Sequence, residues 1–418
     1  MTIIPPIIKE HDTIPESYWE QLSDICFEGN PPKFMGKPKY LGIDQYFTAS
    51  YFIGASWLVK NELAVIVTPK MKNIDFVTMF LKALEVDTKN ASDYFAQCYG
   101  IEFDEPTIET NEQLNQLTPL LVLHFISLLE RLVKRGLKKD YIIREENLKT
   151  KAKGRLLVTN HLQKNVFQQR FDRVFCQYQE YTDDIPENRL LKKALLFADR
   201  IINSYKSLKP QSSFPEIQSR LFRLKSLLEG IPDEIEPYQV QMLSTNKLFK
   251  EYKDAIRVAK MLLRRYDYSI SKASQVQHST PPFWIDMSRL YEMWVLSVLQ
   301  KNSMNEILFQ ERGFYGRQIA DFVIREEKMV LDAKYKPDYQ NIGFVDINDI
   351  REISGNARDE KLLPDISEDY SPRCVILYPG NECELLPESN KLFCEQGTKI
   401  PNYRNFYKIS IKLPITNL

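Results

Sequence analysis

Two apolar runs in the last third of the chain carry charged residues that a packed sheet must accommodate. The first, "GRQIADFVI", begins at Gly316, and the second, "MVLDAKYK", begins at Met329. Both runs have the apolar and β-branched content of strands, and the polar segment "REEK" between them is typical of a turn. The pattern therefore predicts two strands that pair with each other through a short connection.

Charged residues in this strand pair form a candidate site. Because side chains alternate between the faces of a strand, Asp332, Lys334 and Lys336 share one face, and the turn brings Asp321 close to Asp332. Adjacent carboxylates repel each other, so an ionised pair requires a cation, and magnesium fits as a hard ion that binds one or two carboxylates and several waters. A lysine beside it can polarise an attacking water. Together these groups predict phosphodiester hydrolysis.

The spacing of an acid two residues before a lysine is weak evidence by itself. The chain contains it at Asp87–Lys89, Glu251–Lys253, Glu326–Lys328, Asp332–Lys334 and Asp359–Lys361. Four of these pairs lie in polar stretches, where a surface ion pair is the simpler interpretation. Asp332 lies in an apolar run with a second acid one strand away. That setting favours a functional role, with a charge on an edge strand as the alternative.

Length and composition indicate a multidomain globular protein. The 418 residues exceed one ordinary core, and 43% hydrophobic with 27% charged residues is typical of a soluble chain. No apolar run is long enough to cross a bilayer, and the N-terminal stretch lacks the features of a signal peptide. Six scattered cysteines without a CxxC pair indicate a reducing compartment. We therefore expect a cytoplasmic protein without a membrane partner.

The four histidines do not share a metal-ligand spacing, which argues against histidine-based chemistry. His124 lies in the apolar stripe of a predicted helix, where a hydrogen-bonded core residue is the simpler interpretation than a ligand. The expected site therefore depends on carboxylates and lysine.

The order of the patterns predicts a multidomain α+β protein with three domains. Residues 1–110 read as a small α+β domain, with a strand pair in "YFTASYFIGASWLV" and "ELAVIVTPKM" and a helix after Asn73 or Asp75. Residues 111–270 read as mainly helical, including a helix from Leu117 that ends at Gly136 and a β-like patch at "YIIREENLKTKAKGRLLVTNHL".

Residues 271–418 read as a compact α/β domain. An amphipathic helix in "FWIDMSRLYEMWVLSVLQ" precedes the strand pair, and a second helix in "DINDIREISGNARDEKLL" follows it. The runs "CVILYPG" and "FYKISIKLPI" predict two further strands. Helices and strands in this order predict a compact α/β arrangement of about the size of one domain.

Charge is distributed unevenly although the net charge is zero. Residues 1–110 carry 9 Lys and Arg against 16 Asp and Glu, residues 111–270 carry 29 against 19, and residues 271–418 carry 18 against 21. An acidic first segment and a basic middle segment suit a protein partner and a polyanion respectively, whereas solvated helices explain the middle equally well.

The motifs resemble those of the McrC family, the nuclease subunit of McrBC-type and LlaJI-type restriction systems, within the PD-(D/E)xK nuclease superfamily. The residues that carry the resemblance are "LYEMWVLSVL" with Glu292, "GRQIADFVI" with Asp321, and "LDAKYK" with Asp332 and Lys334. The upstream segments "KGRLLVTNHLQKN" and "LAVIVTPKMKNIDFVTMFLKAL" are also similar and stand in the same order. The resemblance implies a C-terminal PD-(D/E)xK nuclease domain over residues 271–418.

By this resemblance Asp321 and Asp332 hold Mg2+, Lys334 serves the nucleophilic water, and Glu292 is an acid that faces the site. A solvent-facing position on the helix is the alternative for Glu292. Related enzymes often present a glutamine on the later helix, where this chain has Arg351-Glu352. Arg351 could contact a phosphate, although an exposed helical arginine is the simpler account.

The resemblance further implies a DNA endonuclease of phage defence that cleaves duplex, modified DNA together with a GTP-hydrolysing AAA+ ring (McrB-like). The chain has no GxxxxGK[ST] loop of its own, which agrees with an external motor. The acidic, aromatic first segment is the expected docking element, unless its aromatic residues form its own core. Lys149, Lys151, Lys153 and Arg155 could contact the DNA backbone or form a solvated loop.

Two other functions stay open. A nuclease-like adaptor would bind DNA or regulate a ring without catalysis, and a stand-alone structure-specific nuclease would cleave without a partner. Retention of both acids and the lysine disfavours the adaptor, because an adaptor does not need a charged cluster on a buried strand.

Overall fold

The computed structural model describes residues 5–22, 38–71, 74–86, 90–95, 97–102, 105–110, 117–208, 215–240, 250–271, 278–316, 318–341, 343–364, 371–380 and 397–415. The chain forms two compact units. Unit 1 combines Met1–Gln116 with Val276–Leu418, and unit 2 is Leu117–Gln275. Asn73 and the cysteines at positions 26, 383 and 394 lie outside the described residues.

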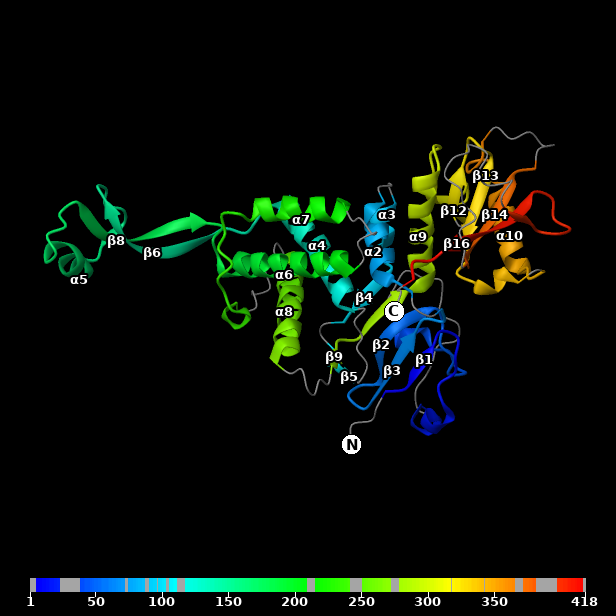
Figure 1. The fold of residues 1–418 in the computed structure, drawn as a ribbon, viewed down its shortest axis with the longest axis horizontal. Coiled ribbons are helices and arrows are strands. Elements are labelled where there is room, and N and C mark those ends of the chain that lie inside the picture. Colours follow the sequence, from blue (N-terminus) through cyan, green and yellow to red (C-terminus); the bar gives the residue numbers. More distant parts are fainter. Residues whose placement is uncertain are drawn as a thin grey trace. The chain divides into compact units, whose positions relative to one another are not determined.

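Unit 1 contains two main sheets and a short two-stranded ladder (Figure 1). The strands from its N-terminal segment are β1 (Ile7–Lys9), β2 (Phe52–Val59), β3 (Leu63–Thr68), β4 (Tyr99–Ile101) and β5 (Ile108–Thr110). Those from its C-terminal segment are β9 (His278–Thr280), β10 (Phe283–Asp286), β11 (Leu308–Arg312), β12 (Ile319–Ile324), β13 (Met329–Ala333), β14 (Arg373–Gly380), β15 (Thr398–Lys399) and β16 (Phe406–Lys412). Its helices are α1 (Trp19–Leu22), α2 (Phe76–Glu85), α3 (Ala91–Phe95), α9 (Met287–Asn302) and α10 (Ile347–Asn356).

The first sheet of unit 1 draws strands from both ends of the chain. Its order is β1-β3-β2-β10-β4, and the predicted strand pair is confirmed as antiparallel β2 and β3. Strand β10 lies between β2 and β4 and pairs antiparallel with both. Gly54 permits this approach, because a Cβ built there would lie 2.1 Å from the carbonyl oxygen of Phe283.

This shared sheet explains why the structure has two compact units where the sequence predicts three domains. A strand from the C-terminal segment completes a sheet of the N-terminal segment, so residues 1–110 and 271–418 do not form separate cores. The helix predicted from Phe283 also begins later than expected. Phe283–Asp286 extend as β10, and α9 begins at Met287 with Asp286 as its N-cap, which accepts a hydrogen bond from Arg289 N (3.0 Å).

The second sheet of unit 1 has the order β11-β12-β13-β14-β16-β15. Strands β11, β12 and β13 are antiparallel, whereas β13, β14 and β16 run parallel. Helix α10 lies in the connection from β13 to β14, as parallel strands require. The predicted pair of β12 and β13, the helix α10 and the strands β14 and β16 are therefore confirmed, and β13 is buried along its whole length.

Helix α2 begins at one of the two caps that the sequence indicates. Asp75 caps α2, because its side chain accepts hydrogen bonds from Thr78 N (3.2 Å) and Thr78 Oγ1 (2.7 Å). Helix α2 lies beside α9, which in turn contacts β13 (Figure 1). Its aromatic residues Phe76 and Phe80 are buried, as are Phe95 and Tyr99 further along the segment. These side chains form a core.

Unit 2 is mainly helical, with one three-stranded sheet. Its helices are α4 (Leu117–Arg135), α5 (Val158–His161), α6 (Pro186–Leu208), α7 (Pro215–Leu227) and α8 (Lys250–Ser271), and its strands are β6 (Asp140–Lys149), β7 (Arg155–Leu156) and β8 (Arg173–Thr182). Helix α4 ends before Gly136, whose φ of 98° suits a C-terminal cap, as predicted. Helices α4, α6 and α8 pack on one another.

A long hairpin extends from these helices (Figure 1). Strands β6 and β8 pair antiparallel without interruption from Asp140↔Thr182 to Lys149↔Arg173. At the tip, the side-chain amides of Asn147 and Asn165 exchange two hydrogen bonds of 2.8 Å, and Asn165 is fully buried. We call residues 140–182 the arm.

His124 and the length of the helices can be compared with the expectations from the sequence. His124 is partly buried in α4, and burial lowers the pKa of its imidazole to about 4, so it is neutral at pH 7. That state agrees with a core role. Across the described residues, no helix combines the length and apolar character needed to cross a bilayer.

Candidate functional site

Asp321 and Asp332 occupy neighbouring strands in the middle of the mixed sheet. The register of β12 and β13 runs through Ile324↔Met329, Val323↔Val330 and Phe322↔Leu331. The next positions along this register are Asp321 and Asp332. The antiparallel pairing therefore brings the two acids together, as their strand positions predict.

Lys334 completes the predicted set. Its Nζ lies 2.9 Å from Asp332 Oδ2 and donates to Glu352 Oε2 over 2.9 Å. The side chain of Asp332 is buried and that of Lys334 is 17% exposed. The contact between Lys334 and Asp332 lacks hydrogen-bond geometry, so the buried Asp332 Oδ2 has an ion pair but no hydrogen bond.

Asp321 receives hydrogen bonds on both of its oxygens. The backbone N–H of Ala333 donates to Oδ2 over 2.9 Å, and the side-chain amide of Gln310 donates to Oδ1 over 3.0 Å. The first bond ties the Asp321 side chain to the end of β13. The second ties it to β11, a strand that the sequence patterns do not indicate.

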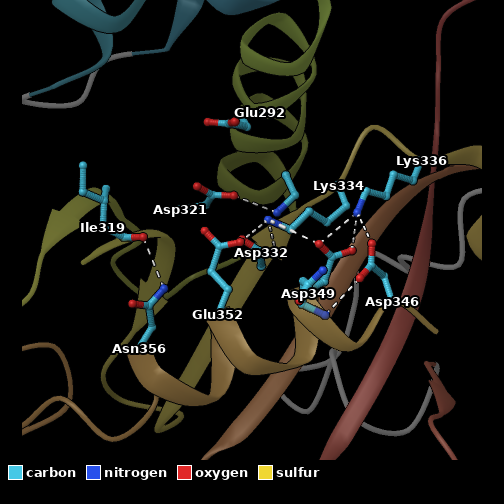
Figure 2. A network of polar contacts seen from close by, with 12 residues as sticks. Glu292, Ile319, Asp321, Asp332, Lys334, Lys336, Asp346, Asp349, Glu352 and Asn356 are labelled. Carbon is cyan, nitrogen blue, oxygen red and sulfur yellow. Dashed lines mark hydrogen bonds and ion pairs between the residues drawn. The ribbon is translucent and has the colours of Figure 1, made fainter. Parts of the chain in front are cut away.

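Glu292 faces the site from α9 (Figure 2). Its side chain is 9% exposed, so the solvent-facing alternative is wrong. Its Oε2 accepts hydrogen bonds from Tyr94 Oη and from Gln310 Nε2, the latter over 2.9 Å. Gln310 therefore connects Glu292 to Asp321.

Lys336 belongs to a neighbouring cluster (Figure 2). Its Nζ donates to Asp346 Oδ2 over 2.7 Å and to Asp349 Oδ2 over 2.8 Å. Tyr339 Oη donates to the same oxygen of Asp349 over 2.7 Å. Strand β13 ends at Ala333, before both lysines, and Asp349 links them, because its Oδ1 also lies 4.0 Å from Lys334 Nζ.

Burial controls the electrostatics of the carboxylates. It is the main reason that the pKa of Asp321 rises to about 7 and that of Glu292 to about 8. Repulsion from Glu292 contributes to the pKa of Asp321, and repulsion from Asp286 and Asp332 contributes to that of Glu292. The pKa of Asp332 also rises well above its ordinary range, mainly by burial. Burial alone would lower the pKa of Lys334, but Asp332, Asp321 and Glu352 raise it, so the lysine stays protonated at neutral pH.

The carboxylates of the site offer oxygen ligands for a divalent cation. Among the described residues no three His, Cys, Asp or Glu side chains converge to hold a metal ion alone. Two neighbouring carboxylates and a buried Asp332 oxygen without a hydrogen bond suit magnesium, which keeps several waters and needs one or two carboxylates. Asp321 and Asp332 are therefore the residues that could hold it.

Two further candidates lie on the surface. Arg351 is exposed on α10. Lys149, Lys151, Lys153 and Arg155 are exposed on the arm, at the end of β6 and in β7. The Nζ of Lys153 lies 4.0 Å from the centre of the Tyr178 ring, which places this lysine against the hairpin.

Sequence patterns did not indicate Gln310 or Tyr94 as site residues. Gln310 follows the short apolar stretch "ILF", which has no alternation long enough to identify a strand. Tyr94 reaches the site from the N-terminal segment, a contact between residues 198 positions apart that local patterns cannot show. Glu352 lies in the predicted helix that became α10, but its contact with Lys334 depends on how α10 packs.

A second buried group lies beside the site, next to Lys334 in sequence. Lys70 Nζ donates to the carbonyl oxygen of Tyr335 over 2.7 Å and lies 4.2 Å from the centre of its ring. Glu10 Oε2 accepts from Lys70 N over 2.9 Å and from Tyr335 Oη over 3.4 Å. Lys70 of the N-terminal segment therefore holds the backbone of Tyr335, the residue after Lys334.

The fold and the site define a multidomain α+β protein with a buried carboxylate–lysine centre on a mixed sheet. A family model described as "McrBC 5-methylcytosine restriction system component" matches residues 52–349. The match spans more than half of the chain. The chain therefore belongs to the family of McrBC restriction system components.

Solved structures similar to this chain include two assemblies from Thermococcus gammatolerans. One is a half-complex of McrB AAA+ hexamers with bound McrC, with 16% identity, a TM-score of 0.38, and coverage of 98% of this chain and 94% of the other. The second is the McrBC complex determined by cryo-EM, with 16% identity, a TM-score of 0.31, and coverage of 71% and 87%. Among curated proteins no match was found.

Proposed function

We propose that this chain is the Mg2+-dependent DNA endonuclease subunit of a GTP-dependent restriction system, with a PD-(D/E)xK nuclease site in its C-terminal segment. The observation that carries the proposal is the juxtaposition of Asp321 on β12, the buried Asp332 on β13 and Lys334 just after β13, with Lys334 Nζ 2.9 Å from Asp332. Membership of the McrBC family supports it. The substrate would be double-stranded, modified DNA.

The residues of the site have separate roles in this proposal. Asp321 and Asp332 would hold magnesium, which supplies positive charge next to a phosphodiester oxygen when it is bound. Lys334, kept protonated by the acids around it, would orient the attacking water through its N–H groups. Glu292, on α9, would hold the position of Asp321 through their shared hydrogen-bond donor, Gln310. The low exposure of these side chains excludes bulk water from the reacting groups.

A partner is part of the proposal. The family resemblance implies an AAA+ GTPase ring, and the exposed apolar residues of the arm support a docking position there. They are Tyr141, Ile143, Leu156, Val158, Leu162, Phe167, Phe171 and Tyr181. In the N-terminal segment, whose aromatic residues were expected to dock, Phe52, Phe76, Phe80, Phe95 and Tyr99 are buried, and Trp19 and Tyr46 are exposed. The larger group of exposed apolar side chains lies on the arm. We therefore place the docking element on the arm.

A non-catalytic adaptor is the second candidate, and one observation favours it. Lys334 is already paired with Asp332 and Glu352, and both oxygens of Asp321 accept hydrogen bonds from the protein. Such a closed network can be a purely structural device. An adaptor would regulate the ring or bind DNA without cleaving it.

Cleavage by the assembled complex separates the two candidates. The chain is purified with its cognate AAA+ GTPase, and cutting of 5-methylcytosine-containing and unmodified duplex DNA is measured with GTP and Mg2+. We expect Asp332→Asn and Lys334→Ala to reduce cleavage by about 10²-fold or more while GTP hydrolysis continues. Glu326→Gln is the matched control, since Glu326 has the same spacing to a lysine and lies exposed in the turn between β12 and β13.

Each outcome has a defined meaning. Cleavage by the parent complex that both site variants retain would show that the site assignment is wrong. A complex that hydrolyses GTP and does not cut DNA in the presence of Mg2+ would favour the adaptor. Cutting by the chain without its partner would indicate the stand-alone nuclease.

A further inference from the structure

Gln310 occupies the space between two acids of the site. Its Nε2 atom donates to Glu292 Oε2 over 2.9 Å and to Asp321 Oδ1 over 3.0 Å. A primary amide carries two N–H groups, so one side chain can form both bonds at once. The bridge fixes the relative positions of a helix carboxylate and a strand carboxylate.

The backbone of Gln310 is held in an uncommon conformation. Its φ is 51°, in the left-handed region that residues with a Cβ rarely adopt, although the flanking pairs Phe309↔Phe322 and Glu311↔Ala320 keep the register of β11 and β12. Asn90 Nδ2 donates to the carbonyl oxygen of Phe309 over 3.0 Å. A strained conformation persists where the surrounding contacts enforce it, and such positions concentrate at functional sites.

Tyr94 supplies a second donor to the same oxygen of Glu292. Its hydroxyl donates to Glu292 Oε2, and its ring packs edge-on against Phe309 with 5.1 Å between the ring centres. The guanidinium of Arg289, on α9, lies 5.0 Å from the centre of the Tyr94 ring. The hydroxyl is thus positioned by its ring, and Glu292 receives two neutral donors.

Not every buried carboxyl group in unit 1 is hydrogen-bonded by neutral donors. Asp349 is also buried, and it is neutralised by Lys336, whose Nζ lies 2.8 Å from Oδ2 and 3.0 Å from Oδ1. By contrast, the hydrogen bonds to Glu292 and Asp321 come from a phenol, an amide and a backbone N–H. Neutral donors orient a carboxyl group without placing a positive charge beside it.

We infer that Gln310 and Tyr94 are positioning residues: they fix Glu292 beside Asp321 and thereby orient Asp321 for a divalent cation. The inference rests on the proposed function, and it extends the site to a strand and a helix outside the acid–acid–lysine motif. Gln310 acts through both carboxylates, and Tyr94 acts through Glu292 alone. Neither residue is assigned a chemical step.

Binding of Mn2+ to the full chain tests this inference. Mn2+ accepts the same oxygen ligands as Mg2+, and its free concentration is measured directly by electron paramagnetic resonance. Gln310→Met keeps the length of the side chain and removes both N–H groups, and Tyr94→Phe removes one hydroxyl. Partners that orient metal ligands typically contribute about 10–100-fold to affinity, so we expect a loss in that range for Gln310→Met and a smaller loss for Tyr94→Phe.

A stability measurement separates positioning from a merely structural role. The rise in Tm caused by saturating Mn2+ reports differential binding to the folded chain. A structural role would lower the Tm equally with and without Mn2+ and leave that rise unchanged, which would overturn the inference. Gln340→Met is the matched control, because Gln340 is exposed and its amide donates to the carbonyl oxygen of Pro379 (3.0 Å).

The Asp332→Asn variant distinguishes failure of this inference from failure of the proposed site. Loss of Mn2+ binding in Asp332→Asn together with unchanged affinity in Gln310→Met and Tyr94→Phe would overturn the inference alone. Unchanged Mn2+ affinity in Asp332→Asn would overturn the proposed metal site and the inference with it. If Gln310→Met does not fold, Tyr94→Phe carries the test, since it removes a single oxygen atom.

Discussion

Single buried residues in unit 1 depend on partners from the other end of the chain. Glu10 is 2% exposed, and its Oε1 is buried without a hydrogen bond. Burial raises the pKa of its carboxyl from 4.5 to about 7, because the charged form loses its hydration. The folded chain therefore keeps a proton on Glu10 at a pH where the unfolded chain has released it.

This difference predicts a pH-dependent stability of unit 1. A folded pKa above the unfolded value contributes stability below about pH 4.5, and that contribution is lost as the pH rises toward 7. As the pH rises across this window, the parent chain should lose roughly 1–3 kcal/mol more unfolding free energy than the Glu10→Gln variant loses. The measurement is urea unfolding at several pH values followed by tryptophan fluorescence, since all four tryptophans (19, 57, 284 and 294) lie in unit 1.

Glu16→Gln is the control for this pH series. Glu16 lies in the same segment and is exposed, so its substitution should not change the pH dependence. A difference between the parent and Glu10→Gln that stays constant from pH 4.5 to 7 would contradict the assigned pKa.

The arm is an element that is stabilised by contacts between its own residues. Its two strands pair over ten residues each, and the buried Asn165 at the tip bonds Asn147 and the imidazole Nδ1 of His161 (2.9 Å). Apolar residues on such an element that remain 77% exposed, as Phe167 and Phe171 do, contribute little to folding. Their exposure is therefore best explained by a partner.

Removal of these two aromatic residues should weaken docking and leave the fold intact. For the double variant Phe167→Ser, Phe171→Ser we expect about 10-fold or greater loss of affinity for the AAA+ ring, because aromatic anchors dominate interfaces. The unfolding free energy should change by less than about 0.5 kcal/mol, as for other surface substitutions. Affinity is measured by titrating the labelled chain with the ring.

Phe222→Ser serves as the comparison, because Phe222 is 70% exposed on α7, away from the arm in sequence. Equal effects of the two substitutions would show that loss of any exposed aromatic residue weakens binding. Unchanged affinity in the double variant would remove the arm as the docking element.

For the whole molecule, the order of strands in the first sheet decides which fragments can fold. Strand β10 loses both neighbours, β2 and β4, if residues 1–110 are removed, and α9 loses the contact with α2. Exposure of buried side chains such as Phe283 and Ile285 costs about 1.5–3 kcal/mol each. Unit 2, by contrast, has its own helical core and is continuous in sequence.

We therefore predict that residues 117–275 unfold cooperatively as an isolated fragment, whereas residues 271–418 do not. Circular dichroism during thermal melting measures both transitions. Co-expression of residues 1–116 with 271–418 should restore a cooperative transition, which controls for simple loss of solubility. A sharp transition in residues 271–418 alone would show that this segment is an independent domain.

Local patterns were sufficient for elements whose signals lie within a few residues. The pairing of β12 with β13 followed from alternation and a short polar turn, the start of α2 from the cap at Asp75, and the end of α4 from Gly136. The positions of Asp321, Asp332 and Lys334 followed from the same alternation. These features depend on neighbours in sequence, which is why one sequence determined them.

Tertiary structure decided the features that depend on distant residues. The strand β10 looked like the first turn of a helix, because "FWID" has apolar residues that suit either state, and its extended form comes from pairing with β2 and β4. The hydrogen bonds of Tyr94 and Gln310 to Glu292 likewise join separate segments. The sequence by itself determined which charged residues share a strand pair, and the packing of both chain ends decided what surrounds them, because burial and long-range contacts have no local signal.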